Sequence, residues 1–367
     1  MEATKYRGAR LSFIDAAKGV GILMIMFGHI TSLSNPVDSW MSSFKISLFY
    51  VVTGYLYSYT QTPIKRSFGE FSKRLFETLL IPYLWFSLFG SLFKAACVLL
   101  RHEGLTEALL MLMRCLANTL VLKGINSLWF IPTMIIGALV FYGLLHAPKG
   151  IQLTYAIFGP FAVSIARQTV LASEMLTGTY VYWLVILAGK LIPVVGKGLM
   201  AAWFMGTGYL LQTACPAHNR NNTSKELWAG IALSIVNICL SRLNHGAVDI
   251  NSLREGSRPW LFYISGVVGS FGLLLLLKSV CSTHATHWLE YLGKNSFVIM
   301  ATQTVFGLRD IAYAGWDSLV PIPTAASFEY IFECFMALLV LVLLEYAAVE
   351  IINSRLPFLL GKRRTYN

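Results

Sequence analysis

The sequence predicts an all-α polytopic membrane protein with about ten transmembrane helices. Hydrophobic residues make up 56% of its 367 residues and charged residues only 13%, and the mean hydropathy is +0.62. A soluble domain usually carries about a quarter charged residues. Because one span needs about 20 apolar residues, a chain of this length holds about ten spans. The composition excludes a disordered chain, a collagen-like fibre and a disulfide-stapled secreted module.

Ten apolar segments separated by polar ones are the predicted spans. They fall near residues 14–33, 43–60, 77–100, 127–146, 151–172, 199–213, 227–242, 259–279, 295–309 and 327–352. Leu105–Leu122 carries two charged residues, so we expect an interfacial helix there. Tyr180–Val195 is interrupted by Lys190 and Pro193 and is either a short span or a re-entrant piece. No internal repeat or low-complexity linker is visible, which predicts a single domain over residues 1–367.

The basic residues predict the orientation. With ten spans and a cytosolic N-terminus, the basic loop Lys65–Arg74 and the basic tail at 361–364 both lie in the cytosol. An eleventh span would place the tail outside, against the positive-inside rule. We therefore expect both termini to be cytosolic. The net charge of +11 then indicates contact with anionic membrane lipid or an anionic cofactor, and we expect no nucleic-acid partner.

Motifs for metals and nucleotides are missing from the sequence. The six cysteines are scattered and lack the spacing of a zinc or redox motif. His284 and His287 lie three residues apart, but no third ligand follows at a useful spacing, so no metal is expected. Without a phosphate-binding glycine loop or a dinucleotide fingerprint, ATP and NAD have no support as cofactors.

Polar residues in the first predicted span are the main evidence for a functional site, because placing each of them in hydrocarbon costs free energy. Lys18 and His29 are eleven residues apart, which places them on nearly the same helix face, about 16 Å apart along the axis. Asp15 precedes Lys18 by one turn and is expected to neutralise it. The plainer alternative is an ion pair at the membrane interface and a histidine that makes an interhelical hydrogen bond.

Six segments, in order along the chain, resemble the membrane-bound acyltransferase-3 family, in its branch of polysaccharide and sugar O-acyltransferases. They are Asp15–His29, Ser47–Leu56, Lys73-Arg74 with Ile81–Tyr83, Leu128–Pro132, Val248–Asn251 with Arg258–Tyr263, and Leu292–Ser296. The resemblance implies a multi-pass enzyme of the bacterial inner (cytoplasmic) membrane. It also implies transfer of an acyl group, expected to be acetyl, from acyl-CoA to a hydroxyl of a sugar, polysaccharide or other cell-envelope acceptor.

The chain departs from the family pattern at two positions. Lys45 stands in a stretch where the family usually has a histidine, and Gln303 stands where a second histidine is frequent. These replacements put a cation and a neutral amide in place of titratable rings. They favour an altered acceptor, an altered acyl group or a more anionic ligand than usual.

Acyl transfer from a thioester to a hydroxyl requires a base for the hydroxyl proton, or a nucleophile that carries the acyl group. It also requires donors for the developing oxyanion. His29 is the candidate for base or acyl carrier, since an imidazole takes either role near neutral pH. Asp15 and Lys18 complete the expected catalytic set, with Asp15 acting by holding Lys18.

The acyl-CoA donor that the resemblance implies has its own candidate residues. Its phosphates would lie on the basic pair Lys73 and Arg74, and its pantetheine arm along the Lys18 face. Ser296 and Gln303 are seven residues apart and share a helix face, so they either offer hydrogen bonds to the donor or join two helices.

Residues expected on the outer side of the membrane are candidates for acceptor binding. Lys45 and Trp129 begin two of the predicted spans, and Asp249, Asn251 and Arg258 lie in one loop. Their side chains can bind sugar hydroxyls or an acceptor charge. The plainer alternatives are interfacial anchors for the first two and a loop held by its own hydrogen bonds for the others.

Two other classes of function suit a ten-helix protein with intramembrane polar residues. One is a transporter or flippase of a lipid-linked sugar, although no pair of broken helices recurs in two halves of the chain. The other is a non-catalytic membrane partner of a polysaccharide synthase. The expected partners are membrane lipid and a carbohydrate or glycolipid acceptor, and a homodimer is left open.

Overall fold

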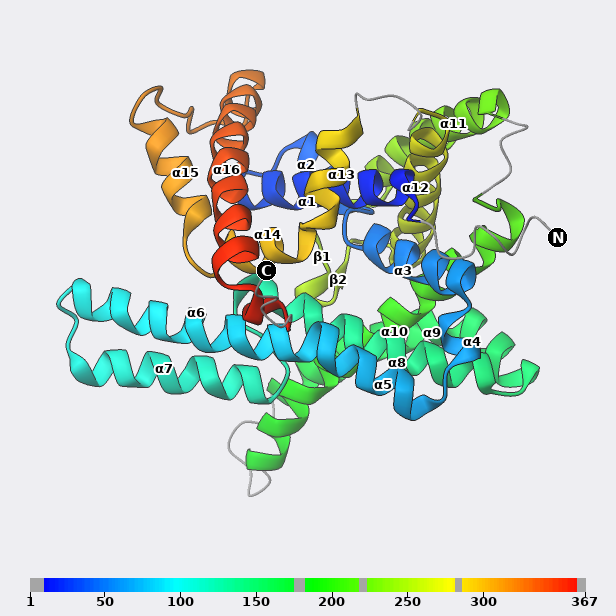
Figure 1. Ribbon diagram of the computed structural model, residues 1–367, viewed down its shortest axis with the longest axis horizontal. Coiled ribbons are helices and arrows are strands. Elements are labelled where there is room, and N and C mark those ends of the chain that lie inside the picture. Colours follow the sequence, from blue (N-terminus) through cyan, green and yellow to red (C-terminus); the bar gives the residue numbers. More distant parts are fainter. Residues whose placement is uncertain (1–9, 175–181, 218–222, 281–285, 362–367) are drawn as a thin grey trace.

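The computed structural model describes residues 10–174, 182–217, 223–280 and 286–361 and is built almost entirely of helices (Figure 1). In chain order these are α1 (Ser12–Ile30), α2 (Pro36–Ser42), α3 (Ser47–Thr60), α4 (Thr62–Lys65), α5 (Phe68–Leu75), α6 (Ile81–Leu100), α7 (Leu105–Leu120), α8 (Phe130–His146), α9 (Lys149–Glu174), α10 (Tyr182–Ala214), α11 (Thr223–Leu243), α12 (Pro259–Val280), α13 (His287–Lys294), α14 (Ser296–Thr302), α15 (Leu308–Asp317) and α16 (Phe328–Arg355). A π-helical turn, η2 (Phe76–Leu80), joins α5 to α6, and a 3₁₀ turn, η3 (Asn126–Trp129), leads into α8. The short strands β1 (Val248–Asp249) and β2 (Arg254–Glu255) pair antiparallel.

Seven helical segments in the described residues are long and apolar enough to cross a membrane. They are Ser12–Ile30, Phe68–Leu100, Asn126–His146, Leu191–Ala214, Thr223–Leu243, Pro259–Val280 and Phe328–Arg355. This confirms an all-α membrane protein, while the count of ten spans and the cytosolic termini stay predictions.

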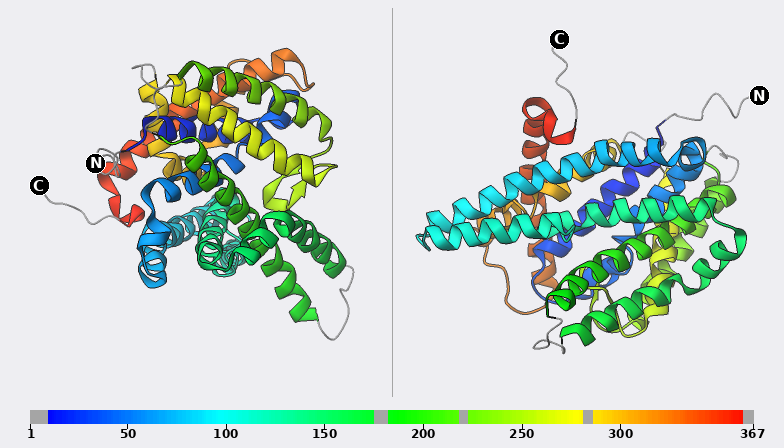
Figure 2. Two further views of the ribbon diagram at one scale, coloured as in Figure 1. Left: turned by 90° about the vertical axis from the view of Figure 1, so that its right-hand side faces the viewer. Right: turned by 90° about the horizontal axis from the view of Figure 1, so that it is seen from below.

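Three predicted segments are compared with the helices that the structure has in their place. The span expected at 295–309 is not one helix: α14 covers only seven residues, about 10 Å of rise, which is too short to cross a bilayer. Most of Tyr180–Val195 is joined to the next predicted span in the single helix α10, which contains Pro193; residues 180–181 lie outside the described residues. Most of Leu105–Leu122 forms α7, which runs antiparallel beside α6 (Figures 1 and 2), and its position at the membrane interface stays a prediction.

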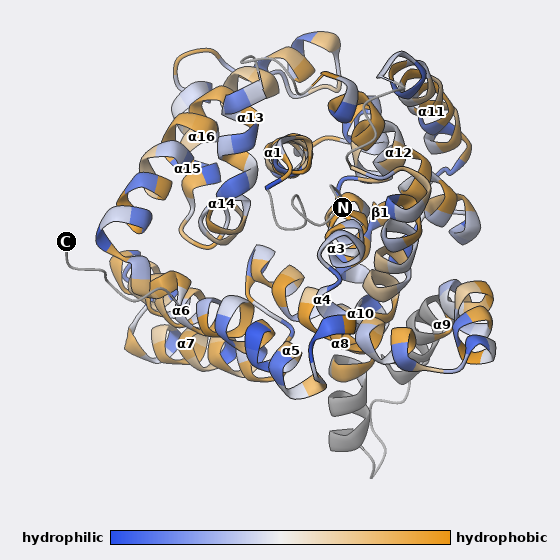
Figure 3. Ribbon diagram, turned by 45° about the vertical axis from the view of Figure 1, so that its right-hand side comes forward, coloured by the Kyte–Doolittle hydropathy of each residue, from blue (hydrophilic) through white to orange (hydrophobic). Residues whose placement is uncertain are grey.

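Helix α1 lies at the centre of the bundle, with α3, α12, α13, α14 and α16 around it (Figure 3). Glycines let its neighbours approach at backbone distance. A Cβ at Gly19 of α1 would overlap the backbone oxygen of Leu289 on α13, and one at Gly293 of α13 would overlap that of Asp15 on α1. Small residues permit such close crossings of membrane helices.

The same reciprocal arrangement joins α3 to α10. A Cβ at Gly54 would overlap the Met205 oxygen, and one at Gly208 would overlap the Val51 oxygen. Because backbone atoms block these positions, neither side can yield by changing a rotamer. These two crossings fix α1 and α3 at the centre of the molecule.

We predict that Gly208→Ala destabilises the protein, because the α3–α10 crossing has no room for a methyl group. Overpacking of this kind costs about 1–3 kcal/mol, and thermal unfolding in detergent measures it. Gly206→Ala, two residues away on the same helix with nothing within 4 Å of its Cβ, is the control and should be neutral or slightly stabilising. Equal melting temperatures for the two variants would contradict this packing.

Candidate active site

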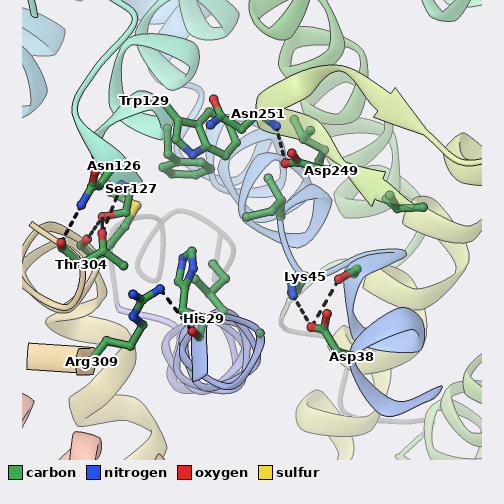
Figure 4. Close-up of a pocket in the computed structure, with 18 of the residues that line it drawn as sticks. His29, Asp38, Lys45, Asn126, Ser127, Trp129, Asp249, Asn251, Thr304 and Arg309 are labelled. Carbon is green, nitrogen blue, oxygen red and sulfur yellow. Dashed lines mark hydrogen bonds and ion pairs between the residues drawn. The ribbon is translucent and has the colours of Figure 1, made fainter. Parts of the chain in front are cut away.

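A cavity of about 590 Å³ lies at the C-terminal end of α1 (Figure 4). Its walls come from segments far apart in the sequence: α1, α2, the turn before α3, η3, the β1 region and the α14–α15 connection. The polar residues that line it are His29, Asp38, Ser42, Lys45, Asn126, Ser127, Asp249, Asn251, Thr304, Arg309 and Asp310. We call it the outer cavity.

His29 stands in the last turn of α1, and its ring points into the outer cavity (Figure 4). The imidazole makes no hydrogen bond to any other residue that the structure describes, so it is not the interhelical link of the plainer alternative. Hydrogen bonds instead hold the main chain at His29 and just after it. The Tyr330 hydroxyl accepts hydrogen bonds from the amides of Ser32 and Leu33, at 2.7 and 2.9 Å, and Arg309 donates to the His29 carbonyl at 3.5 Å.

Lys45 and Asp38 form an ion pair on one side of the cavity, with 2.7 Å between Nζ and Oδ1. Asp38 lies in the first turn of α2, where the Asn35 side chain accepts its amide hydrogen at 2.8 Å. The pair lies directly against α1 at Gly28, where a Cβ would overlap both charged groups. Since Asp38 balances Lys45, this position gives no support to an unusually anionic ligand.

Trp129, Asp249 and Asn251 form the wall opposite α1 (Figure 4). Asp249 orders its own loop, because its carboxylate accepts hydrogen bonds from the main-chain N–H of Asn251 at 3.0 Å and from the Ser252 hydroxyl at 2.6 Å. Lys197 of α10 lies behind the wall, 3.0 Å from Asn251 Oδ1 and 4.8 Å from the centre of the Trp129 ring. The wall therefore presents an aromatic face beside polar groups.

A hydroxyl and amide cluster closes a third side. Ser127 donates to the Met300 carbonyl at 2.5 Å and lies 2.8 Å from the Thr304 hydroxyl. The side-chain amide of Asn126 donates a hydrogen bond to the Thr304 carbonyl at 2.6 Å. These bonds join η3 to the last turn of α14 and to the residues after it.

Arg309 and Asp310, at the start of α15, form an ion pair beside His29. The Arg309 amide donates to the Gln303 carbonyl at 2.9 Å, which holds this turn in place. A second cavity of about 390 Å³ is also lined by His29, Arg309 and Asp310, together with Tyr313. His29, Arg309 and Asp310 therefore border both of these cavities.

An inner cavity of about 220 Å³ lies along α1 on the side of Lys18. Lys18 and Ser296 line it together with apolar and aromatic side chains. Three residues, Ile25, Phe130 and Met300, line both the inner and the outer cavity. These three side chains separate the two cavities, and α1 borders both.

Not every predicted site residue reaches a cavity. Asp15 pairs with Arg10 at 2.5 Å and makes no ion pair with Lys18, so the expected Asp15–Lys18 pair is absent. Arg258 is exposed, and its amide donates to Asn244 outside the cavity. Gln303 is fully buried, and its side-chain amide has no partner within the described residues.

Lys73 and Arg74 are exposed on α5, beyond the inner cavity. Phe71 of the same helix packs against Tyr57, whose ring lines that cavity, with 5.6 Å between the ring centres. Arg74 follows Phe71 by three residues and so lies on the same side of the helix. Arg74 is therefore close to Tyr57 at the edge of the inner cavity, whereas Lys73 forms an ion pair with Glu77 at 3.9 Å.

Sequence reasoning missed several polar residues of the outer cavity: Asp38, Asn126, Ser127, Thr304, Arg309 and Asp310. They lie in the short helix α2, in the turn η3, after α14 or at the start of α15, where polar residues are ordinary. Lys197 carried a usable signal, because a lysine within an apolar stretch long enough to cross a membrane marks a functional candidate. No group of three or more metal-binding side chains occurs among the residues that the structure describes.

Of three comparisons with known proteins, one found a match. A family model described as an acyltransferase domain, acyltransferase-3, matches residues 11–346. The chain belongs to the acyltransferase-3 family. It is therefore a multi-pass membrane acyltransferase, and His29 and the cavity walls lie within the matched region. Searches of curated proteins and of solved structures gave no match.

We predict that Gly28→Ala displaces the Lys45–Asp38 pair, because the added methyl group would occupy the space of both charged groups. Both partners are flexible side chains, so the fold should survive while acyl-transfer activity falls by about 10–100-fold, the effect of a misplaced active-site group. Gly143→Ala on α8, with nothing within 4 Å of its Cβ, is the matched control. Full activity of Gly28→Ala would show that the pair's position does not matter.

Proposed function

We propose that the protein is an acyl-CoA-dependent O-acyltransferase that acts on a hydroxyl of a sugar, polysaccharide or other cell-envelope acceptor, with acetyl as the expected group. The observation that carries the proposal is that His29 lines the outer cavity, which shares Ile25, Phe130 and Met300 with the inner cavity. The apolar inner cavity suits a thioester arm, and the polar outer cavity suits an acceptor. One imidazole borders the place where the two substrates would meet.

The donor would enter from the cytosolic side of a bacterial inner membrane. Lys73 and Arg74 would hold the coenzyme A phosphates, since phosphates bind readily to such cations. The pantetheine arm would follow the inner cavity past Lys18 and Ser296 toward His29. This arrangement keeps both chain termini on the donor side, as the basic loops predict.

His29 would take the proton of the acceptor hydroxyl, and the hydroxyl oxygen would attack the thioester carbonyl. The carbon–sulfur bond then breaks, and the proton leaves with the coenzyme A thiol. In the two-step alternative the imidazole nitrogen attacks first and carries the acyl group to the acceptor. Lys45 and Arg309, which line the same cavity, are the cations placed to stabilise the oxyanion.

The acceptor would bind in the outer cavity. A flat aromatic face at Trp129 next to the carboxylate of Asp249 and the amide of Asn251 suits a polyhydroxylated ring, which has apolar faces and a polar edge. The charges of Lys45 and Arg309 are each matched by a neighbouring carboxylate. This balance favours an acceptor without a strong charge of its own.

We predict that His29→Gln leaves a folded protein that has lost at least about 100-fold in acyl transfer, the lower bound for general base catalysis. The assay incubates purified protein with radiolabelled acetyl-CoA and a membrane glycolipid extract. His146→Gln is the control, because that ring lies on α8 and bonds to its own helix at the Tyr142 carbonyl, 2.9 Å away.

Near-normal turnover of His29→Gln would remove the proposed site. Transfer in neither the wild type nor His146→Gln would instead favour a transporter or an accessory membrane protein. Capture of an acyl group on His29 after rapid quenching would choose the two-step route over direct transfer.

A further inference from the structure

Lys197 is a buried cation that the mechanism above does not use. It lies on α10 within Leu191–Ala214, a segment apolar enough to cross a membrane, and is only 2% exposed. A charge in such a segment is costly and usually faces a protein interior or a cavity. Its retention therefore calls for a specific set of partners.

The partners of Lys197 both belong to the outer cavity. Its Nζ donates to Asn251 Oδ1 at 3.0 Å and lies over the Trp129 ring, 4.8 Å from the ring centre. Both of these residues line the cavity, whereas Lys197 is behind them. Within the described parts of the chain no carboxylate lies close enough to form an ion pair with it.

The hydrogen bond from Lys197 determines which way the side-chain amide of Asn251 faces. An ammonium group has donors only, so the Asn251 atom directed at Lys197 must be the carbonyl oxygen. The backbone of Asn251 is held separately, by its hydrogen bond to Asp249 Oδ1. The two amide hydrogens are then left for the cavity, since they bond to no other residue among those described.

We propose that Lys197 is a positioning residue for the acceptor, an inference that rests on the function proposed above. It holds the Asn251 amide with its N–H groups facing the outer cavity and keeps the Trp129 ring beside it. The wall then offers hydrogen-bond donors to an oxygen atom next to a flat apolar face. Such a wall selects an acceptor that carries a hydroxyl or ring oxygen at this point, as a sugar ring does.

Three single variants separate this role from simple packing. Lys197→Met removes the donors at similar length, and Lys197→Arg keeps donors and can stack on the tryptophan. Asn251→Asp keeps the shape and gives Lys197 an anionic partner, but it removes the amide hydrogens. Each variant is assayed with radiolabelled acetyl-CoA and a membrane glycolipid extract, and acetyl-CoA affinity is measured separately.

We expect Lys197→Met and Asn251→Asp each to raise the KM for the acceptor about tenfold, the effect of one lost hydrogen bond. Acetyl-CoA affinity should not change in any of them. The double variant Lys197→Met/Asn251→Asp should have a KM no higher than either single variant, and Lys197→Arg should keep the KM of the wild type. An unchanged KM with only a lower melting temperature would show that Lys197 is purely structural. Additive losses in the double variant would contradict action through Asn251.

Hydrogen exchange of the substrate-free protein gives a readout that does not depend on the proposed function. The amides of residues 248–252 should exchange faster in Lys197→Met than in the wild type or Lys197→Arg. Equal exchange in all three would overturn the positioning role. Absence of acyl transfer by the wild type, with the exchange difference present, would reject the proposed function and keep Lys197 as the residue that orders this wall.

Discussion

The close backbone approach of α1 to its neighbours is the constraint on which the rest of the site depends. Gly19 and Gly293 let α1 and α13 touch at their main chains, and Gly28 lets a charged pair lie against the other end of α1. Helices without a hydrophobic driving force between them associate through such tight packing. A helix fixed along its length holds His29 at one depth, on the wall of the outer cavity.

The charges around His29 show how polar groups are kept in an apolar protein. Lys45 pairs with Asp38, and Arg309 pairs with Asp310. The Lys45–Asp38 pair is mostly buried, so the loss of one partner would leave an uncompensated charge, whereas the Arg309–Asp310 pair is largely exposed and weaker. Lys197 is the exception, because its partners are an amide and an aromatic ring.

The sequence was sufficient for the helical membrane fold, because hydropathy is a local property. Short motifs also singled out His29, Trp129, Asp249 and Asn251, which the structure brings to one cavity, while their roles stay predictions. The sequence could not supply Arg309, whose bond to the His29 carbonyl joins residues 280 positions apart. The Asp15–Lys18 pair failed for a different reason. Helical spacing allowed that contact, but Arg10, just before α1, takes the Asp15 carboxylate instead.

The predicted span at 295–309 marks another limit of local patterns. Its residues are apolar enough for a membrane helix, yet they form the short helix α14 and a turn that brings Thr304 and Arg309 to the cavity. The hydrogen bonds that stabilise this turn come from Asn126 and Ser127, on a distant segment. Hydropathy is a local property, so it cannot predict where a helix ends because of hydrogen bonds to a distant segment.

The central claim is that the inner cavity delivers the acyl group to His29, and photo-crosslinking tests it most directly. A short-chain acyl-CoA with a diazirine at the end of its acyl group is bound to the intact protein, irradiated and mapped by mass spectrometry. A continuous path predicts labels on Ile25, Phe130 and Met300, which border both cavities, and their loss with excess coenzyme A. Labels confined to lipid-facing helices such as α11, or unaffected by coenzyme A, would contradict it.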